Sequence, residues 1–328
     1  MTGLPARWLA RECQRFGEVI LEETVRIGVI GCGVMGRNHV RVLADTKGFE
    51  LVGIVDHNVD VRESAAHASG AVACATIEEL LARGIDAAVV ALPTSLHHDV
   101  GAQLIKAGVH VLIEKPIART VEEAHALIAL ADQHDRRLVV GHVERFNPAI
   151  EGLRQAIGDE EILSVAVTRV GPFPPRIGDV GIVIDLGVHD IDLIRWLTRS
   201  EIVDHQTLVS RTLGEHEDIA FMQFRMESGA LASINTNWLT PFKQRRIDVS
   251  TRHRFISCDM LLRTVSEFSR YQPDGGYLHR SIGIGFHEPL KAELQAFRAA
   301  ILGTAPVAVT GADGARALEI ALTSLRDA

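Results

Sequence analysis

Hydrophobic positions in the first half of the chain form short continuous runs, and the segments between these runs show helical spacing. The runs occupy residues 25–31, 50–56, 86–92, 110–116 and 137–142, and the helical segments occupy 34–45, 60–69, 96–107 and 120–134. Short apolar strands that alternate with helices indicate a parallel sheet covered on both faces. Residues 25–147 are therefore predicted to form a doubly wound Rossmann domain.

The pattern changes after Pro148. A helix is predicted at 149–157 and a strand at 161–170, and the Gly/Pro-rich loop 171–181 follows. Alternating apolar and polar positions predict antiparallel strands with one packed face at 219–226, 230–239 and 245–259. Helical spacing returns in two segments at the end of the chain, 288–303 and 311–325. Residues 148–328 are thus predicted to be an α+β domain with an open, mostly antiparallel sheet, which makes the whole chain an α/β protein of two domains.

Residues 1–24 form an extension before the first domain. Apolar residues at helical spacing predict a helix over 4–21, and charges throughout this extension argue against a signal peptide. No function is assigned to it.

Composition narrows the class of protein further. A chain of 328 residues exceeds what one core usually supports, in agreement with two domains. The net charge of −8 argues against nucleic-acid and anionic-membrane partners, and no apolar run reaches the roughly 18 residues of a membrane span, so a cytoplasmic location is expected. The four cysteines show no zinc or dithiol spacing, and no histidine cluster predicts a metal site.

A glycine pattern joins the first predicted strand to the first predicted helix. Gly31, Gly33 and Gly36 form G-x-G-x-x-G, which permits a tight turn, close approach of a pyrophosphate and close helix packing, respectively. Asp56 ends the next strand, where a carboxylate binds the adenosine ribose and repels a 2′-phosphate. The pattern predicts NAD as the cofactor, with a glycine turn that binds nothing as the alternative. The expected contacts here are Gly31, Gly33, Val34, Met35, Gly36 and Asp56.

Two other strand ends carry polar residues. Lys115, in IEKPIA, lies at the carboxyl end of its strand, where doubly wound folds bind ligands, so its ammonium can lie near a reacting hydroxyl. A surface lysine is the alternative interpretation. In ALPTSLHH, Thr94 either contacts the cofactor or caps the following helix. The further expected cofactor contacts are Pro93, Thr94, His97, Glu114 and Lys115.

Three ionisable residues interrupt an otherwise apolar helical segment, DLGVHDIDLIRWL at 185–197. Asp185, His189 and Asp192 are spaced i, i+4 and i+7, which places them on one helix face. Two interpretations are open: a histidine satisfied by a neighbouring aspartate, or a polar stripe that carries chemistry.

In combination, these motifs resemble the Gfo/Idh/MocA family of sugar and cyclitol dehydrogenases. The resemblance covers residues 25–326 and rests on the glycine motif with its later aspartate, on Glu-Lys-Pro at 114–116, and on D-x-x-x-H-D at 185–190, in this order. It implies that the catalytic residues Lys115, Asp185 and His189 meet at the nicotinamide.

Within the family, residues 140–148 and 169–192 resemble the branch that oxidises UDP-N-acetylglucosamine at C3 to a 3-keto sugar nucleotide. The resemblance places three arginines near the cleft, where guanidinium groups suit a diphosphate, although each can equally be an ion-pair partner. The expected substrate contacts are Lys115, Arg145, Asn147, Arg169, Arg176, Asp185 and His189.

A mechanism follows from these assignments. His189 would accept the hydroxyl proton as general base, and Lys115 would stabilise the developing alkoxide charge through a hydrogen bond. Asp185 would orient the imidazole or bind a neighbouring sugar hydroxyl. Two alternatives stay open: an NAD-dependent dehydrogenase of a free sugar or inositol, and a non-catalytic NAD-binding regulator.

The open face of the second sheet bears on the oligomeric state. A broad apolar sheet face is rarely left exposed to solvent in a stable monomer, so a homodimer or homotetramer is expected.

Overall fold

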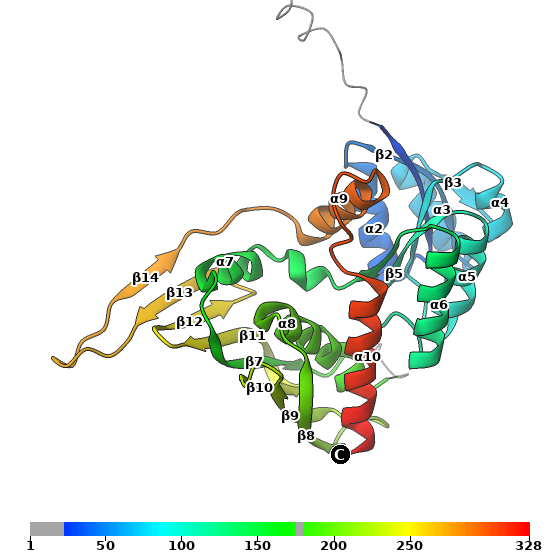
Figure 1. The fold of residues 1–328 in the computed structure, drawn as a ribbon. Helices are drawn as coiled ribbons and strands as arrows, with labels where there is room; N and C mark the ends of the chain where they lie inside the picture. The colour runs from blue at the N-terminus through cyan, green and yellow to red at the C-terminus, as the bar shows by residue number, and fades with distance from the viewer. Residues whose placement is uncertain (1–22, 175–179) are drawn as a thin grey trace, which may run out of the picture.

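The computed structural model of the protein describes residues 23–174 and 180–328, so the helix predicted at 4–21 and Arg176 lie outside the described residues. Two sheets form the framework (Figure 1), one of six strands in the order β3-β2-β1-β4-β5-β6 and one of eight in the order β14-β13-β12-β11-β7-β10-β9-β8. The predicted α/β class, with a Rossmann sheet followed by a second, mostly antiparallel sheet, is confirmed.

The first sheet is parallel throughout. Its strands are β1 (Val25–Ile30), β2 (Phe49–Val55), β3 (Val72–Cys74), β4 (Ala87–Val90), β5 (His110–Glu114) and β6 (Leu138–Gly141). The helices between them are α2 (Val34–Ala44), α3 (Val59–Ser69), α4 (Ile77–Leu81), α5 (His97–Lys106) and α6 (Val121–Gln133). The short elements β3 and α4 are not predicted from the hydrophobic pattern. The strand order reverses between β1 and β4, and this reversal opens a ligand crevice at the carboxyl ends of the strands.

The second sheet is antiparallel except where β10 pairs with β7. Its strands are β7 (Ile162–Pro172), β8 (Ile202–Ser210), β9 (Ile219–Met226), β10 (Leu231–Asn237), β11 (Leu239–Thr251), β12 (Arg254–Asp259), β13 (Thr264–Ser269) and β14 (His279–Ile282). The prediction of a single strand at 245–259 is wrong. This segment forms two strands, because the chain turns after Thr251 so that Phe255 pairs with Ser250.

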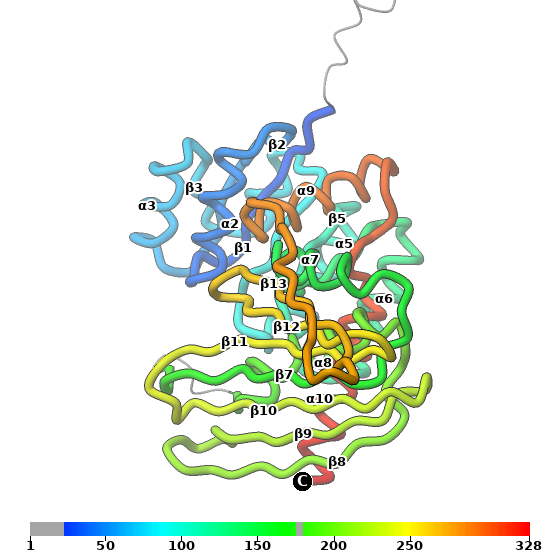
Figure 2. The backbone as a smooth tube through the Cα atoms, turned by 90° about the vertical axis from the view of Figure 1, so that its left-hand side faces the viewer, coloured from blue at the N-terminus to red at the C-terminus, as the bar shows by residue number. Residues whose placement is uncertain are grey.

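One face of the second sheet carries helices and the other is open (Figures 1 and 2). Helices α7 (Pro148–Ile157), α8 (Val188–Thr198) and α10 (Gly311–Arg326) cover the first face, onto which β9 directs the buried side chains of Ala220, Met222 and Phe224. Alternation along the strands places five exposed apolar side chains on the open face: Leu163, Leu208, Phe221, Leu231 and Phe255.

The last two helices connect the two sheets. Helix α9 (Pro289–Ile301) returns to the first domain, where Leu290, Leu294 and Phe297 join the core formed by β1 and α2. Helix α10 then packs against both α6 and α8 (Figure 1). The hydrophobic pattern predicts both helices but not this return to the first domain. No helix in the described part of the chain is long and apolar enough to cross a membrane.

Candidate active site

The glycine loop between β1 and α2 is shaped by close backbone contacts. Gly31 has a φ of +91°, and a Cβ at this position would overlap the carbonyl oxygen of Ala91. A Cβ at Gly36 would overlap the carbonyl oxygen of Gly31. In contrast, a Cβ at Gly33 would meet no atom within 4 Å. The fold therefore requires Gly31 and Gly36, whereas Gly33 leaves open space beside the backbone.

The open space lies at the N-terminus of α2. No described side chain caps this helix, and its first turn contains no acidic residue, so its free N–H groups and positive dipole end are available to an anion. The carboxylate of Asp56 accepts hydrogen bonds from the backbone N–H groups of Cys32, at 2.6 Å, and Asn58, at 2.8 Å. Two bonds leave acceptor capacity on the carboxylate for ribose hydroxyls. These residues fit the pyrophosphate and ribose of a dinucleotide.

The other expected cofactor contacts divide into two groups. Val34, Met35, Pro93 and Thr94 lie at the carboxyl edge of the sheet and are exposed or partly exposed. His97 and Glu114 turn inward, where the ring nitrogens of His97 lie 2.8 Å from the Pro116 carbonyl and 2.9 Å from the Leu92 carbonyl. Glu114 accepts a 2.8 Å hydrogen bond from His39. These two side chains hold the loops at the crevice in place and do not face it.

Lys115 joins the two domains. Its position at the end of the buried strand β5 directs its ammonium to the segment before α8, where Nζ donates to the backbone oxygen of Asp185 at 2.7 Å and to Oδ1 at 3.1 Å. Both side chains are less than one-fifth exposed. An ammonium has three donors, so one N–H of Lys115 stays available to a substrate oxygen.

The predicted helix at 185–197 begins as a π-helical turn. Residues Val183–Gly187 form this turn, and α8 continues from Val188. Such turns are frequent at functional sites because the extra residue changes the direction of the side chains. Asp185, His189 and Asp192 share one helix face, and each meets a residue that follows a strand of the first sheet. Asp185 meets Lys115 after β5, and His189 meets His142 after β6. Asp192 meets Arg145 in the 3-10 helix Val143–Phe146.

His189 is a neutral imidazole at neutral pH. Burial, together with the positive charges of Lys115 and Arg169, holds its pKa well below 6.5. Its Nδ1 is buried and has no hydrogen-bond partner among the described residues. His189 as a residue is partly exposed, so the buried Nδ1 leaves Nε2 as the ring nitrogen that can meet a substrate. A neutral imidazole in this position can accept a proton.

Two of the predicted diphosphate contacts are committed to other partners. Arg145 is 7% exposed and binds Asp192 through Nε at 2.8 Å. Arg169 is 2% exposed and binds Asp190 at 2.7 Å and Glu144 at 2.9 Å.

Asn147 is also committed. Its side chain caps α7 by accepting from the N–H of Ala149, and it donates to Glu144. Because Asp192, Asp190 and Glu144 hold these three side chains, they belong to the junction between the domains and are not free to wrap a diphosphate.

Two residues to which the sequence motifs give no role lie at this site. Arg245 on β11 donates to Glu144 at 2.9 Å, yet its side chain is 33% exposed and its charge acts on both Asp185 and His189. Nothing in the hydrophobic pattern separates Arg245 from its exposed neighbour Arg246. His142 lies against His189, and its burial is apparent only in the folded chain.

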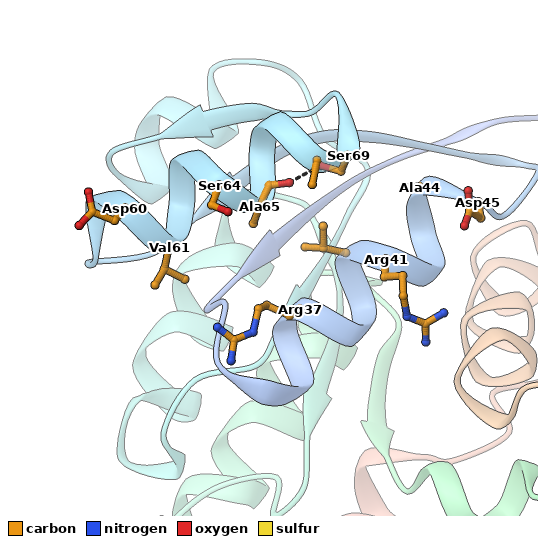
Figure 3. Close-up of a pocket in the computed structure, with 11 residues that line it drawn as sticks. Arg37, Arg41, Ala44, Asp45, Asp60, Val61, Ser64, Ala65 and Ser69 are labelled. Atoms are coloured by element: carbon orange, nitrogen blue, oxygen red, sulfur yellow. Dashed lines mark hydrogen bonds between the residues drawn. The ribbon is translucent and has the colours of Figure 1, made fainter.

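A separate cleft of about 530 Å³ lies between α2 and α3 (Figure 3). Arg37 and Arg41 of α2 and Asp60 of α3 line it together with small side chains. None of the catalytic candidates lines this cleft, so it is distinct from the site around Lys115.

Comparisons with known proteins agree with this geometry. Residues 25–142 match the oxidoreductase family model with an NAD-binding Rossmann fold, and residues 155–255 match the GFO/IDH/MocA C-terminal domain. The chain is 33% identical to UDP-N-acetylglucosamine 3-dehydrogenase of Acidithiobacillus ferrooxidans over 91% of this chain and 95% of the relative. It is 28% identical to inositol 2-dehydrogenase of Rhizobium meliloti over 92% of this chain and 96% of that relative.

Solved structures show the same relationship. The structure of the Acidithiobacillus ferrooxidans enzyme, GnnA, matches with a TM-score of 0.86 and 32% identity over 93% of this chain and 97% of the other. GenD2 from gentamicin A biosynthesis, solved in complex with NAD, shares the fold with a TM-score of 0.81 at 23% identity over 93% of this chain and 94% of the other. The chain belongs to the Gfo/Idh/MocA family of oxidoreductases, and its first domain is the NAD-binding Rossmann domain of that family.

Proposed function

We propose that this protein is an NAD-dependent dehydrogenase that oxidises the C3 hydroxyl of UDP-N-acetylglucosamine. The proposal rests on two groups that lie together at the carboxyl edge of the Rossmann sheet. One is the ammonium of Lys115, which Asp185 holds, and the other is the neutral imidazole of His189. A proton acceptor and a hydrogen-bond donor at one point are what the oxidation of an alcohol requires.

The residues divide the work as follows. NAD, when bound, supplies the acceptor for the hydride. Nε2 of His189 accepts the hydroxyl proton, and the free N–H of Lys115 stabilises the negative charge that develops on the same oxygen. Asp185 takes two of the three Lys115 donors, so it orients the ammonium. Its carboxylate holds Lys115, and the described residues show no hydrogen bond from it to the imidazole.

Two features support a sugar nucleotide as the substrate. The relative at 33% identity acts, by its name, on UDP-N-acetylglucosamine. In the structure, the partly exposed guanidinium of Arg245 lies beside the catalytic pair, where it can meet an anionic substrate. The inositol dehydrogenases among the relatives keep a neutral cyclitol as the second candidate.

The test is a substrate panel. The purified protein is incubated with NAD and, separately, UDP-N-acetylglucosamine, UDP-glucose, glucose or myo-inositol. Absorbance of the reduced nicotinamide is followed and products are identified by mass. Each reaction is run with and without 2-oxoglutarate, which serves as a second oxidant in case the reduced cofactor stays bound and is reoxidised in place. We expect turnover with UDP-N-acetylglucosamine and a product two mass units lighter. Turnover with myo-inositol alone would establish the second candidate, and no turnover with any compound would favour a non-catalytic regulator.

Arg245→Gln provides a matched control for substrate class. The variant keeps a side chain that can hydrogen-bond to Glu144 but removes the positive charge. We expect KM for the UDP-sugar to rise by about tenfold, the effect of roughly 1.4 kcal/mol of lost charge-assisted binding. An unchanged KM would separate Arg245 from the substrate.

We also propose that the open face of the second sheet is covered in a homodimer or homotetramer. Its five exposed apolar side chains form an apolar surface of a kind that a stable monomer rarely exposes to solvent. Light scattering at micromolar concentration tests this proposal, and Phe221→Asp, on strand β9 of the open face, should dissociate the assembly.

A further inference from the structure

His142 is a buried histidine whose ring is unpaired in the part of the chain that the structure describes. It follows β6 and is 1% exposed, and neither of its ring nitrogens finds a partner among the described residues. A buried polar group left unsatisfied costs about 1–3 kcal/mol, so a side chain of this kind is rarely retained for packing alone. An apolar residue of similar volume would fill the same space without that cost.

The surroundings of His142 form an ordered row of polar side chains. Its ring meets that of His189 edge to face, with the centroids 6.0 Å apart and the planes at 84°. On the other side, its Nδ1 lies 4.0 Å from Oδ2 of Asp192. Asp192 is in turn held by the guanidinium of Arg145. His142 therefore stands between the candidate base and a buried carboxylate.

Charges around the two rings determine their protonation. The groups that act on His142 are Asp192, Arg145, Lys115 and Asp313, and burial lowers the pKa of His142 against the pull of Asp192. The groups that act on His189 are Lys115, Arg169, His142 and Arg245. At neutral pH both rings are neutral, so each carries one N–H and one lone pair.

The carboxylate decides which nitrogen of His142 carries the proton. Asp192 favours the N–H at Nδ1, the nitrogen that faces it, and this leaves the lone pair of His142 on Nε2. A lone pair in this buried space needs a donor, and Nδ1 of His189 is a buried ring nitrogen that has no partner among the described residues.

We propose, on the basis of the dehydrogenase function above, that His142 is a positioning residue that accepts a hydrogen bond from Nδ1–H of His189 and so keeps the Nε2 lone pair of His189 facing the substrate. The bond closes with a small movement of either ring or through one water molecule. The row Arg145, Asp192, His142 and His189 thus selects the tautomer of the base. A base in the other tautomer presents an N–H to the substrate hydroxyl and cannot accept its proton.

Two variants at one position test the role in turnover. His142→Phe fills the same space without an acceptor, and His142→Gln keeps an acceptor oxygen but cannot titrate. We expect kcat to fall by about tenfold to hundredfold in His142→Phe, with KM for NAD unchanged, and to recover in part in His142→Gln. Thermal unfolding should show that His142→Phe is at least as stable as the native protein, because a buried unsatisfied group is removed. An unchanged kcat in His142→Phe would overturn the proposal.

A spectroscopic readout separates this proposal from the substrate assignment. ¹⁵N shifts of the histidine rings distinguish the Nδ1–H from the Nε2–H tautomer, and the His189 signals are those lost in His189→Gln. We expect His189 to be the Nδ1–H tautomer in the native protein and to shift toward Nε2–H in His142→Phe. This result stands even if no UDP-sugar is turned over, which would count against the proposed function alone. A native Nε2–H tautomer would overturn the proposal even in an active enzyme.

Discussion

The glycine loop and the Lys115 junction are two halves of one crevice, yet they are built in different ways. The loop consists of consecutive residues whose function depends on missing side chains, because its backbone contacts leave no room at Gly31 and Gly36. The junction consists of charged side chains from the segments after β5 and β6, from β11, from the turn Val183–Gly187 and from α8. A local motif of backbone shape can be recognised from the sequence, whereas a junction of side chains exists only after two domains have packed together.

The two regions also differ in electrostatics. The glycine loop presents open N–H groups to solvent and contains few charges. At the junction, burial opposes ionisation, but the guanidinium groups of Arg169 and Arg245 lower the pKa of Glu144 below its ordinary value. Buried ion pairs add little net stability, although loss of one partner is strongly destabilising. The junction thus gives a defined geometry to the domain interface at considerable desolvation cost.

The largest expected effect comes from the junction. Lys115→Ala and His189→Ala should each lower turnover by about 10² or more, because each removes a group that acts on the reacting hydroxyl. NAD affinity, measured by calorimetry, should stay within a few-fold of the native value, since the phosphates are predicted to bind at the loop and not at the junction. Near-normal turnover in both variants would show that the junction is not catalytic.

A pair of glycine variants tests the loop. Gly36→Ala would force α2 away from Gly31 and should lower the free energy of unfolding by about 1–3 kcal/mol, with loss of NAD binding. Gly33→Ala is the matched control, because its added methyl group meets no atom within 4 Å and should leave thermal stability unchanged while NAD affinity falls. Equal stability of the two variants would contradict the distinction between these glycines.

Asp56→Asn refines the role of the loop. The amide oxygen can still accept from the N–H of Cys32, but the negative charge that repels a 2′-phosphate is lost. The preference for NAD over NADP should fall by about tenfold, the equivalent of roughly 1.4 kcal/mol. Equilibrium binding of both cofactors measures this ratio, and an unchanged ratio would assign the discrimination to other residues.

The smallest effect concerns a buried carboxyl behind the loop. Burial, with the charge of Glu114 nearby, raises the pKa of Glu293 well above 4.5, and neither of its oxygens has a partner among the described residues. The folded state therefore holds the proton of Glu293 more tightly than the unfolded state does. The free energy of unfolding is highest below pH 4.5, where Glu293 is protonated in both states, and it falls as the pH rises toward the pKa of the folded state.

Glu293→Gln should remove this loss, with a gain on the order of 1 kcal/mol at pH 8 relative to the native protein. Unfolding at pH 5 and pH 8 measures the difference. Glu288→Gln, a more exposed position on the same stretch, is the control and should show no such gain. If the free energy of unfolding changed equally from pH 5 to pH 8 in the native protein and in Glu293→Gln, the raised pKa of Glu293 would be contradicted.

Much of the fold can be predicted because its signals are local. The apolar runs at β1, β2, β4, β5 and β6 are short and continuous, and all five form strands within about three residues of their predicted limits. Strand β3 and helix α4 are too short for a periodic signal, and the turn between β11 and β12 contains neither glycine nor proline. The pattern is weakest where an element is shorter than the period that would reveal it.

The sequence alone determined the Rossmann domain, the glycine loop and the helix face shared by Asp185, His189 and Asp192, because each depends on residues close together in the chain. Tertiary structure decided which side chains meet. Arg145, Arg169 and Arg245 reach buried carboxylates, Arg245 stays partly exposed, and His142 lies against His189. The spacing of an arginine in a chain does not reveal its partner, because a long side chain on either domain finds that partner only when the two domains close on each other.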